Sequence, residues 1–216
     1  MVKRFLGLLF PLVALGMLIG QDSAALGQEG KGLKAGQALP GLFYPYVLNG
    51  PKKDRYRCLV NDKAVGTFVL VFIQGNVVPE PLPKFLASLQ AQLRAFEKTP
   101  GQPSSAIVIF INPDLQSVVK DDTKREAAVK AINAVVDGSS FVVQGPDNKP
   151  REVLVLGLDD PGDVKDYSLD PGNLATLVLC DNLQVKGIKA VSADKGSLEG
   201  LEAAFKELVE LAARKK

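Results

Sequence analysis

The chain contains no histidine and only two cysteines among its 216 residues. The absence of histidine excludes His-based catalytic triads, general acid–base catalysis by imidazole, and most zinc and haem sites. Sulfur chemistry is restricted to Cys58 and Cys180. The sequence also has no phosphate-cradling P-loop and no dinucleotide-binding glycine fingerprint. We therefore expect neither a cofactor nor a metal.

A strong charge of either sign is also missing. The formal net charge is +2, and the basic residues are spread among acidic ones. This balance argues against electrostatic capture of nucleic acid. The two basic clusters, 52–55 and 214–216, are interpreted as a solvated loop and a helix end. Apolar residues make up 46% of the chain, which is ordinary globular composition for a single domain.

The N-terminal segment has the pattern of a secretory signal peptide. Lys3 and Arg4 precede an apolar run over residues 5–19, and small and polar residues follow. The favoured cleavage site follows Gly27, and a site after Ala24 is the alternative. An uncleaved membrane anchor is disfavoured because the run is shorter than the ~20 residues that span a bilayer. We expect residues 1–27 to be removed and the mature protein to be secreted or periplasmic, without membrane attachment.

Residues 28–216 are expected to form one domain. An extended lead-in over residues 34–66 is rich in Gly, Pro and polar residues, with at most short strands. Alternating strand and helix patterns follow, and they predict a parallel sheet with an antiparallel hairpin at one edge. The expected strands are 67–73, 106–111, 141–143, 153–156, 175–180 and 185–191. The expected helices are 83–98, a segment from Asp122 or Thr123 to Gly138, and a final helix after Ser197. Asp181 and Asn182 are expected to form the hairpin turn.

This order, together with two local motifs, resembles the thioredoxin-like superfamily in its redoxin form, which includes peroxiredoxins and secreted thiol-disulfide oxidoreductases. Residues 36–43, closing at 47–50, are similar to the redoxin opening G-x-x-x-P-x-F … G. Residues 174–177 lie where these proteins carry a hydrophobic-Pro-Thr step into the hairpin. The resemblance implies an α/β fold with a central mixed sheet, parallel core strands, a C-terminal β-hairpin and helices on both faces.

The sequence departs from this family at its active-site positions. The family needs a cysteine just after the first core strand, at a helix N-terminus that lowers the thiol pKa. Residues 77–80 resemble the peroxiredoxin motif with Val78 in place of the cysteine before Pro79. The position of the family's cis-proline is Ala175, and a non-proline residue disfavours a cis bond. The sequence thus predicts a degenerate active site at Val78, Pro79 and Ala175.

The two cysteines lie elsewhere. An even pair in an exported protein favours a Cys58–Cys180 disulfide, worth roughly 4–5 kcal/mol in the chain-entropy model. Two buried free cysteines are the second interpretation. Catalysis by Cys58 is the third, because residues 58–61 have CxxC spacing without the second cysteine, and Arg55 and Arg57 flank it. A short strand over residues 56–60 is the expected setting of Cys58.

Two functions follow from these observations. The first is an exported thioredoxin-like module without dithiol catalysis, with a binding or structural role toward a protein partner. The alternative is a thiol-dependent oxidoreductase that uses Cys58, with Cys180 as resolving partner. Asp159 and Asp160 suggest calcium, but EF-hand spacing is absent, so we expect a turn there.

Overall fold

The structure is a computed structural model that describes residues 33–75, 81–96, 99, 101–114, 120–124, 126–127, 130, 142–144, 150–193 and 198–214. The predicted signal peptide 1–27 lies outside the described residues, and so do Val78 and Pro79.

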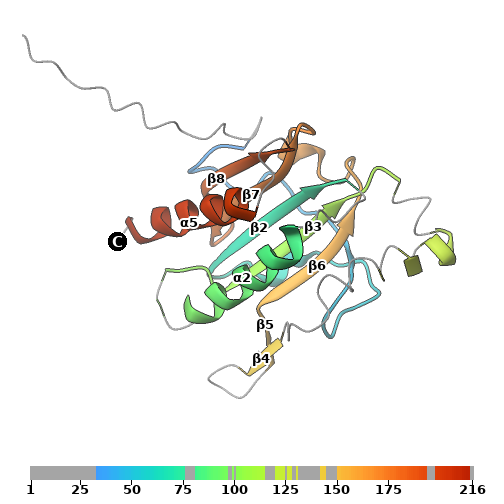
Figure 1. The fold of residues 1–216 in the computed structure, drawn as a ribbon, viewed down its shortest axis with the longest axis horizontal. Helices are drawn as coiled ribbons and strands as arrows, with labels where there is room; N and C mark the ends of the chain where they lie inside the picture. The colour runs from blue at the N-terminus through green and yellow to red at the C-terminus, as the bar shows by residue number, and fades with distance from the viewer. Residues whose placement is uncertain are drawn as a thin grey trace, which may run out of the picture.

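Six strands form the central sheet in the order β1-β6-β3-β2-β7-β8 (Figure 1). They are β1 Tyr46–Val47, β2 Thr67–Gln74, β3 Ser105–Ile111, β6 Leu154–Asp159, β7 Asn173–Asp181 and β8 Gln184–Ser192. Strands β2, β3 and β6 are parallel, whereas β7 runs antiparallel to β2 and pairs with β8 as a hairpin. The expected mixed sheet is confirmed. Strand β4 Val142–Gln144, near the short strand expected there, pairs instead with β5 Pro150–Glu152 in a separate two-stranded sheet.

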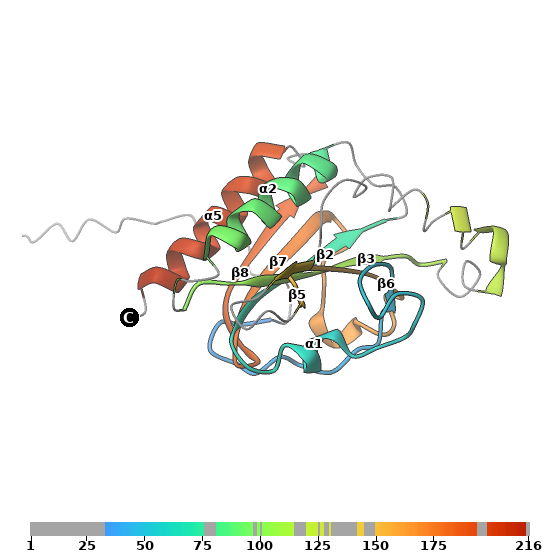
Figure 2. The same ribbon diagram turned by 90° about the horizontal axis from the view of Figure 1, so that it is seen from below.

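One face of the sheet is covered by the two long described helices, α2 Pro81–Phe96 and α5 Leu198–Arg214 (Figure 2). Leu82, Phe85, Leu89 and Leu93 recur at helical spacing along α2, and all are buried against the sheet. Burial of each such side chain is worth about 1.5–3 kcal/mol. The amphipathic pattern is therefore what orients this helix.

The opposite face is covered by the lead-in segment, the one-turn helix α1 Leu59–Asp62 and the 3-10 helix η1 Lys165–Tyr167. Phe43, Phe72 and Tyr167 form its aromatic centre, with ring centroids 5.1–5.8 Å apart. The Tyr167 hydroxyl donates a hydrogen bond of 2.8 Å to the Gly41 carbonyl. Helices thus lie on both faces, as expected, but those described on this face are short.

The strand expected over residues 56–60 was wrong. Tyr56 makes a single bridge to Tyr46, and the chain then turns so that Cys58 is the residue before α1. Leu59 and Val60 are buried from this helical turn, and Arg57 donates two hydrogen bonds of 2.6 Å to Asp62 across it. A short apolar run is compatible with a strand and with a helical turn. The contact between Arg57 and Asp62 spans the helical turn and therefore favours it.

The hairpin turn lies one residue later than expected. Its central residues are Asn182 and Leu183, both in the left-handed region with φ of 49° and 63°. This is the geometry of a two-residue turn that matches the twist of the flanking strands. Of the helix expected from Asp122 or Thr123 to Gly138, residues 122–124, 126–127 and 130 are helical, and the rest lies outside the described residues.

Gly157 lets the lead-in approach the sheet closely. A Cβ atom at this position would lie 2.9 Å from Cβ of Pro45 and 3.1 Å from Cδ1 of Ile109. We predict that Gly157→Ala lowers the free energy of unfolding by about 1–3 kcal/mol, because buried backbone must move. The measurement is urea unfolding. Gly41→Ala is the control, since its Cβ would meet only a side-chain oxygen at 3.5 Å. Equal stability of the two variants would contradict this account.

Candidate functional site

Four neighbouring strands place a row of side chains at one end of the sheet. Ile111 lies opposite Gln74 on one side and opposite Asp159 on the other. Ile73 lies opposite Ala175, so Leu174 is the next residue in line with Gln74. Side chains alternate between the faces of a strand, which puts Asp159, Ile111, Gln74 and Leu174 on the face away from α2 and α5. These are the carboxyl ends of the parallel strands, where open α/β sheets bind ligands.

A cavity of about 570 Å³ lies at this end of the sheet. Gln74, Ile111 and Leu174 contribute its strand wall. The segment between β6 and β7 contributes the facing wall, with Pro161, Val164, Lys165, Ser168, Leu169 and Pro171. Carbon dominates the lining, and the volume is in the range of small-molecule sites.

The described part of this site contains no sulfur. Neither cysteine is among the residues that line the cavity. Ala175 is fully buried beside the end of β2, and the peptide bond before it is trans. Its place next to the end of β2 is the one that the family resemblance implies for the missing cis-proline. The predictions for Val78 and Pro79 lie outside the described residues and stay predictions.

Asp159 is the unusual residue of the row. Its side chain is fully buried, and Oδ1 accepts a hydrogen bond of 2.9 Å from the Asp160 N–H. Oδ2 has no hydrogen-bond partner among the described residues. Burial has the largest effect and raises the pKa of Asp159 to about 7; the hydrogen bond from the Asp160 backbone opposes it, and the nearby Asp163 and Asp160 carboxylates add to the increase. When Asp159 is protonated it can donate a hydrogen bond to Asp163, which also favours the raised pKa.

Asp160 confirms the expected turn. Its Oδ1 accepts a hydrogen bond of 2.7 Å from the Gly162 N–H, the short side-chain turn typical of aspartate. No group of three or more Cys, Asp or Glu side chains among the described residues has the arrangement of a metal site.

Both cysteines lie in the apolar cluster on the lead-in face. Cys180 is completely buried, and desolvation raises the pKa of its thiol well above the ordinary value. Cys58 is half-buried and packs against the same cluster. Besides the dominant effect of burial, both thiols raise the pKa of Tyr167, so all three groups are neighbours. The two thiols are free in the structure, and the disulfide between them stays a prediction.

The buried thiol is remote from the cavity. Cys180 lies opposite Phe68 and Ala175 lies opposite Ile73, five residues further along β2. At about 3.3 Å per residue, this separates Cys180 from the strand ends by roughly 17 Å. Arg57, which flanks Cys58, is held by Asp62. The thiols and the cavity are therefore two separate features of the molecule.

A second cavity of about 450 Å³ lies at the amino ends of β2 and β3. Lys52 pairs with Asp62 at 2.9 Å, and Lys63 donates to the Glu152 backbone carbonyl at 3.1 Å, whereas Glu152 Oε1 has no hydrogen-bond partner among the described residues. Burial alone would raise the pKa of Asp62, but the hydrogen bonds from Arg57 and Lys52 outweigh burial and lower it. We place the candidate site at the carboxyl ends because the cavity there has the more apolar lining and lies where open α/β sheets bind ligands.

Comparison with solved structures places this architecture among known folds. A conserved protein of uncharacterised function from Geobacillus kaustophilus superposes with a TM-score of 0.50, at 14% identity over 85% of this chain and 86% of that one. Reduced Prx3 from Vibrio vulnificus gives 0.46 at 17% identity, over 81% and 99% of the chains. The thioredoxin domain of a thiol-disulfide oxidoreductase from Bacteroides vulgatus gives 0.45 at 13% identity, over 82% and 99%.

The chain has a thioredoxin-like fold. The parallel β2-α2-β3 unit, followed by the β7-β8 hairpin and α5 in one mixed sheet, is the arrangement expected from the sequence. The identities are low, so the likeness concerns the fold alone. No family model matches the chain, and no curated protein matches it. Within the described ranges, every helix is too short or too polar to cross a membrane.

The cavity and the burial of Asp159 were not predicted from the sequence. The third core strand was expected to end at residue 156, whereas β6 continues through Gly157 to Asp159. An acidic residue at the carboxyl end of a parallel strand was the available signal. It was interpreted as part of the following turn, because glycine interrupts the apolar run.

The raised pKa of Asp159 predicts a specific pH dependence of stability. The folded protein holds this proton more tightly than the unfolded chain, whose aspartate has a pKa of about 4. The free energy of unfolding should therefore fall as pH rises from about 4 to about 7. Asp159→Asn removes this titration, so its stability relative to the native chain should rise by more than about 1 kcal/mol over that range.

The measurement is urea unfolding of both proteins at a series of pH values. The control is Asp170→Asn, which replaces an exposed aspartate and retains an acceptor for the Gly172 N–H. It shows the effect of the same replacement at an exposed position over the same pH range. A stability difference between Asp159→Asn and the native chain that stays constant from a pH of about 4 to about 7 would contradict the raised pKa of Asp159.

Proposed function

We propose that this protein is an exported thioredoxin-like binding module that holds an apolar ligand group at the carboxyl ends of β2, β3 and β6 and performs no dithiol catalysis. The carbon-lined cavity of about 570 Å³ at these strand ends is the observation that carries the proposal. The ligand is a small molecule or an apolar group of a partner protein. Export rests on the signal-peptide pattern of residues 1–27.

The chemistry of the described residues supports binding over catalysis. A thiol catalyst needs an accessible thiolate. Cys180 is buried and its pKa is raised, which keeps the thiol protonated at neutral pH. The residue beside the end of β2 is Ala175, at the position where the resemblance implies a cis-proline. Most of the cavity lining is apolar. The polar side chains that can orient a ligand there are Gln74, Lys165, Ser168 and Asn173.

One observation favours a second candidate, the thiol-dependent oxidoreductase. Cys58 is partly exposed and packs against the same apolar cluster as Cys180 and Tyr167. A reversible disulfide between the two would join the lead-in to β7. This candidate requires a thiolate at Cys58 and movement of the buried Cys180, whereas the binding module requires neither.

Binding is tested with a neutral fluorescent probe, N-phenyl-1-naphthylamine. We expect its fluorescence to increase with the mature protein and with Leu42→Asn, which replaces an exposed leucine outside the cavity lining. Leu174→Asn places an amide in the strand wall, and it should weaken binding about tenfold or more. Equal fluorescence for all three proteins, or none for the native one, would contradict the proposal.

The two candidates differ in the behaviour of the cysteines. We expect a thiol-reactive probe to label Cys58 in the native protein only slowly, and Cys180 only after unfolding, because Cys180 is buried. Absence of label until reduction would support the predicted disulfide. Insulin reduction should be no faster with the protein than without it. Rapid labelling of Cys58, together with reductase activity that Cys58→Ser abolishes, would establish the oxidoreductase instead.

A further inference from the structure

We propose that the second cavity, at the amino ends of β2 and β3, binds an organic phosphate monoester. The phosphate dianion sits among the lysine and arginine side chains of the lining, and the organic body lies against the apolar part of the wall. This site is independent of the proposed function, because it lies at the opposite end of the sheet from the apolar cavity.

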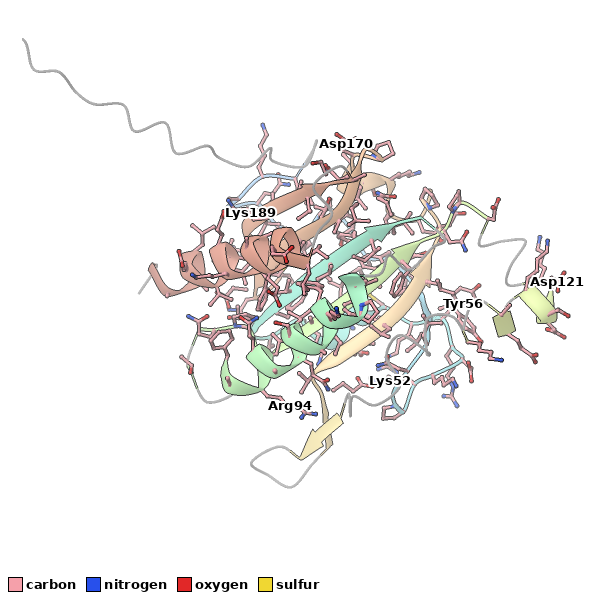
Figure 3. All side chains as sticks on the ribbon, viewed as in Figure 1. Lys52, Tyr56, Arg94, Asp121, Asp170 and Lys189 are labelled. Atoms are coloured by element: carbon pink, nitrogen blue, oxygen red, sulfur yellow. The ribbon has the colours of Figure 1, made fainter. Side chains whose placement is uncertain are left out.

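Three cationic side chains from three different segments line this cavity. Lys52 comes from the lead-in, Lys63 directly follows α1, and Arg94 belongs to the last turn of α2. Figure 3 shows Lys52 and Arg94 on the same side of the molecule, away from Asp170. The fold thus gathers positive charges that are far apart in the sequence, and a phosphate group has enough acceptor oxygens to contact several of them.

The two carboxylates of the lining do not cancel this charge, because a fourth cation outside the lining also faces them. Arg57 donates two hydrogen bonds of 2.6 Å to Asp62. This contact raises the pKa of Arg57 most, desolvation opposes it, and the charges of Asp62 and Glu152 add to the increase, so both carboxylates are its neighbours. Four described cations therefore face two carboxylates. The excess of positive charge matches a phosphate monoester, which carries about −1.5 to −2 charges at neutral pH.

The rest of the lining suits the other parts of such a molecule. Ser104 and Ser105, at the start of β3, line the cavity, and serine hydroxyls can donate hydrogen bonds to phosphate oxygens. Phe68, Leu93 and Val153 are buried apolar residues of the same lining. The volume of about 450 Å³ is in the range of small-molecule sites, so it accommodates the phosphate and an organic body together.

A cationic ligand is the main competitor, because Oε1 of Glu152 is buried without a hydrogen-bond partner among the described residues. This atom lies 2.6 Å from the position that a Cβ atom of Gly50 would take, and Gly50 does not line the cavity. Since solvent does not reach Oε1, a molecule in the cavity does not reach it either. The other lining carboxylate, Asp62, already accepts hydrogen bonds from Arg57 and Lys52.

The experiment compares four probes that share a benzene ring: phenyl phosphate, benzoate, benzyl alcohol and benzylammonium. Binding to the mature protein is followed by amide chemical shifts in NMR titrations at pH about 7.5, where the phosphate is mostly a dianion and the amine is protonated. We expect phenyl phosphate to bind at least about tenfold more tightly than benzyl alcohol, with benzoate between them and benzylammonium weakest. The shifts should be largest at residues 66–67 and 104–105. The affinity for phenyl phosphate should fall when ionic strength rises from about 0.01 M to about 1 M, because the Debye length falls from about 30 Å to about 3 Å.

Paired variants separate the lining from the total charge. Lys63→Gln with Arg94→Gln removes two lining cations, and it should weaken phenyl phosphate binding about tenfold while the affinity for benzyl alcohol stays within about twofold. Lys84→Gln with Lys206→Gln removes the same charge from exposed positions of α2 and α5 outside the lining, and it should change neither affinity by more than about twofold. The amide spectra show whether each variant is folded. If the lining pair is not, Arg94→Gln alone, at an exposed helix position, gives the same test with a loss of several-fold.

Four results would refute this inference. Equal binding of all four probes would show that the cavity ignores charge, and tightest binding of benzylammonium would show that it prefers a cation. Benzoate binding at least as tightly as phenyl phosphate would refute the phosphate dianion. An equal loss in both variant pairs would show that only the total charge matters. Shifts confined to residues 74, 111 and 174 would place the probes in the apolar cavity, which refutes this site and leaves the proposed function intact.

Discussion

The structure depends on the burial of one strand. Every residue of β2 from Phe68 to Ile73 is almost completely buried, and the strand pairs on one side with β3 and on the other with β7. Because side chains alternate, a slip of one residue would exchange the two faces of the strand. Two apolar clusters, one on each face, therefore fix the register of the neighbouring strands. This register places Ile111, Gln74 and Leu174 side by side in the cavity wall. Their alignment therefore does not depend on contacts among these three side chains.

The two faces are covered in different ways, and the cavity follows from the difference. Long amphipathic helices cover one face along the strands. The other face is covered by extended chain, by α1 and by the turns of the segment between β6 and β7. Such cover packs closely where an aromatic side chain anchors it, as Tyr167 does through its contacts with Phe43 and Phe72. At the strand ends the cover consists of prolines and turns, and a cavity remains above Ile111, Gln74 and Leu174.

The strongest periodic patterns in the sequence predicted the fold well. The core strands, the hairpin and the helices at 83–98 and after Ser197 all correspond to described elements, because their apolar spacing is what buries them. Predictions failed where short-range contacts decide the conformation. Arg57 and Asp62 stabilise a turn at Cys58. Gly157 interrupts the apolar run of β6, so the sequence pattern does not show that the strand continues to Asp159. The cavity depends on how a segment without periodicity folds over the sheet, which residue spacing does not encode.

Asp159 gives the strand ends a character that the fold itself does not require. A neutral apolar side chain in its place would pack beside Ile111 without the cost of a buried carboxylate. An ion pair would offset that cost, but Asp159 has no cationic partner within the described residues, and its nearest charged neighbours are carboxylates. Stability at neutral pH is therefore reduced at the end of the sheet that borders the apolar cavity. A group that costs stability beside a cavity is characteristic of binding and active sites. The buried Asp159 carboxylate is therefore a feature of the strand ends that packing of the sheet alone does not explain.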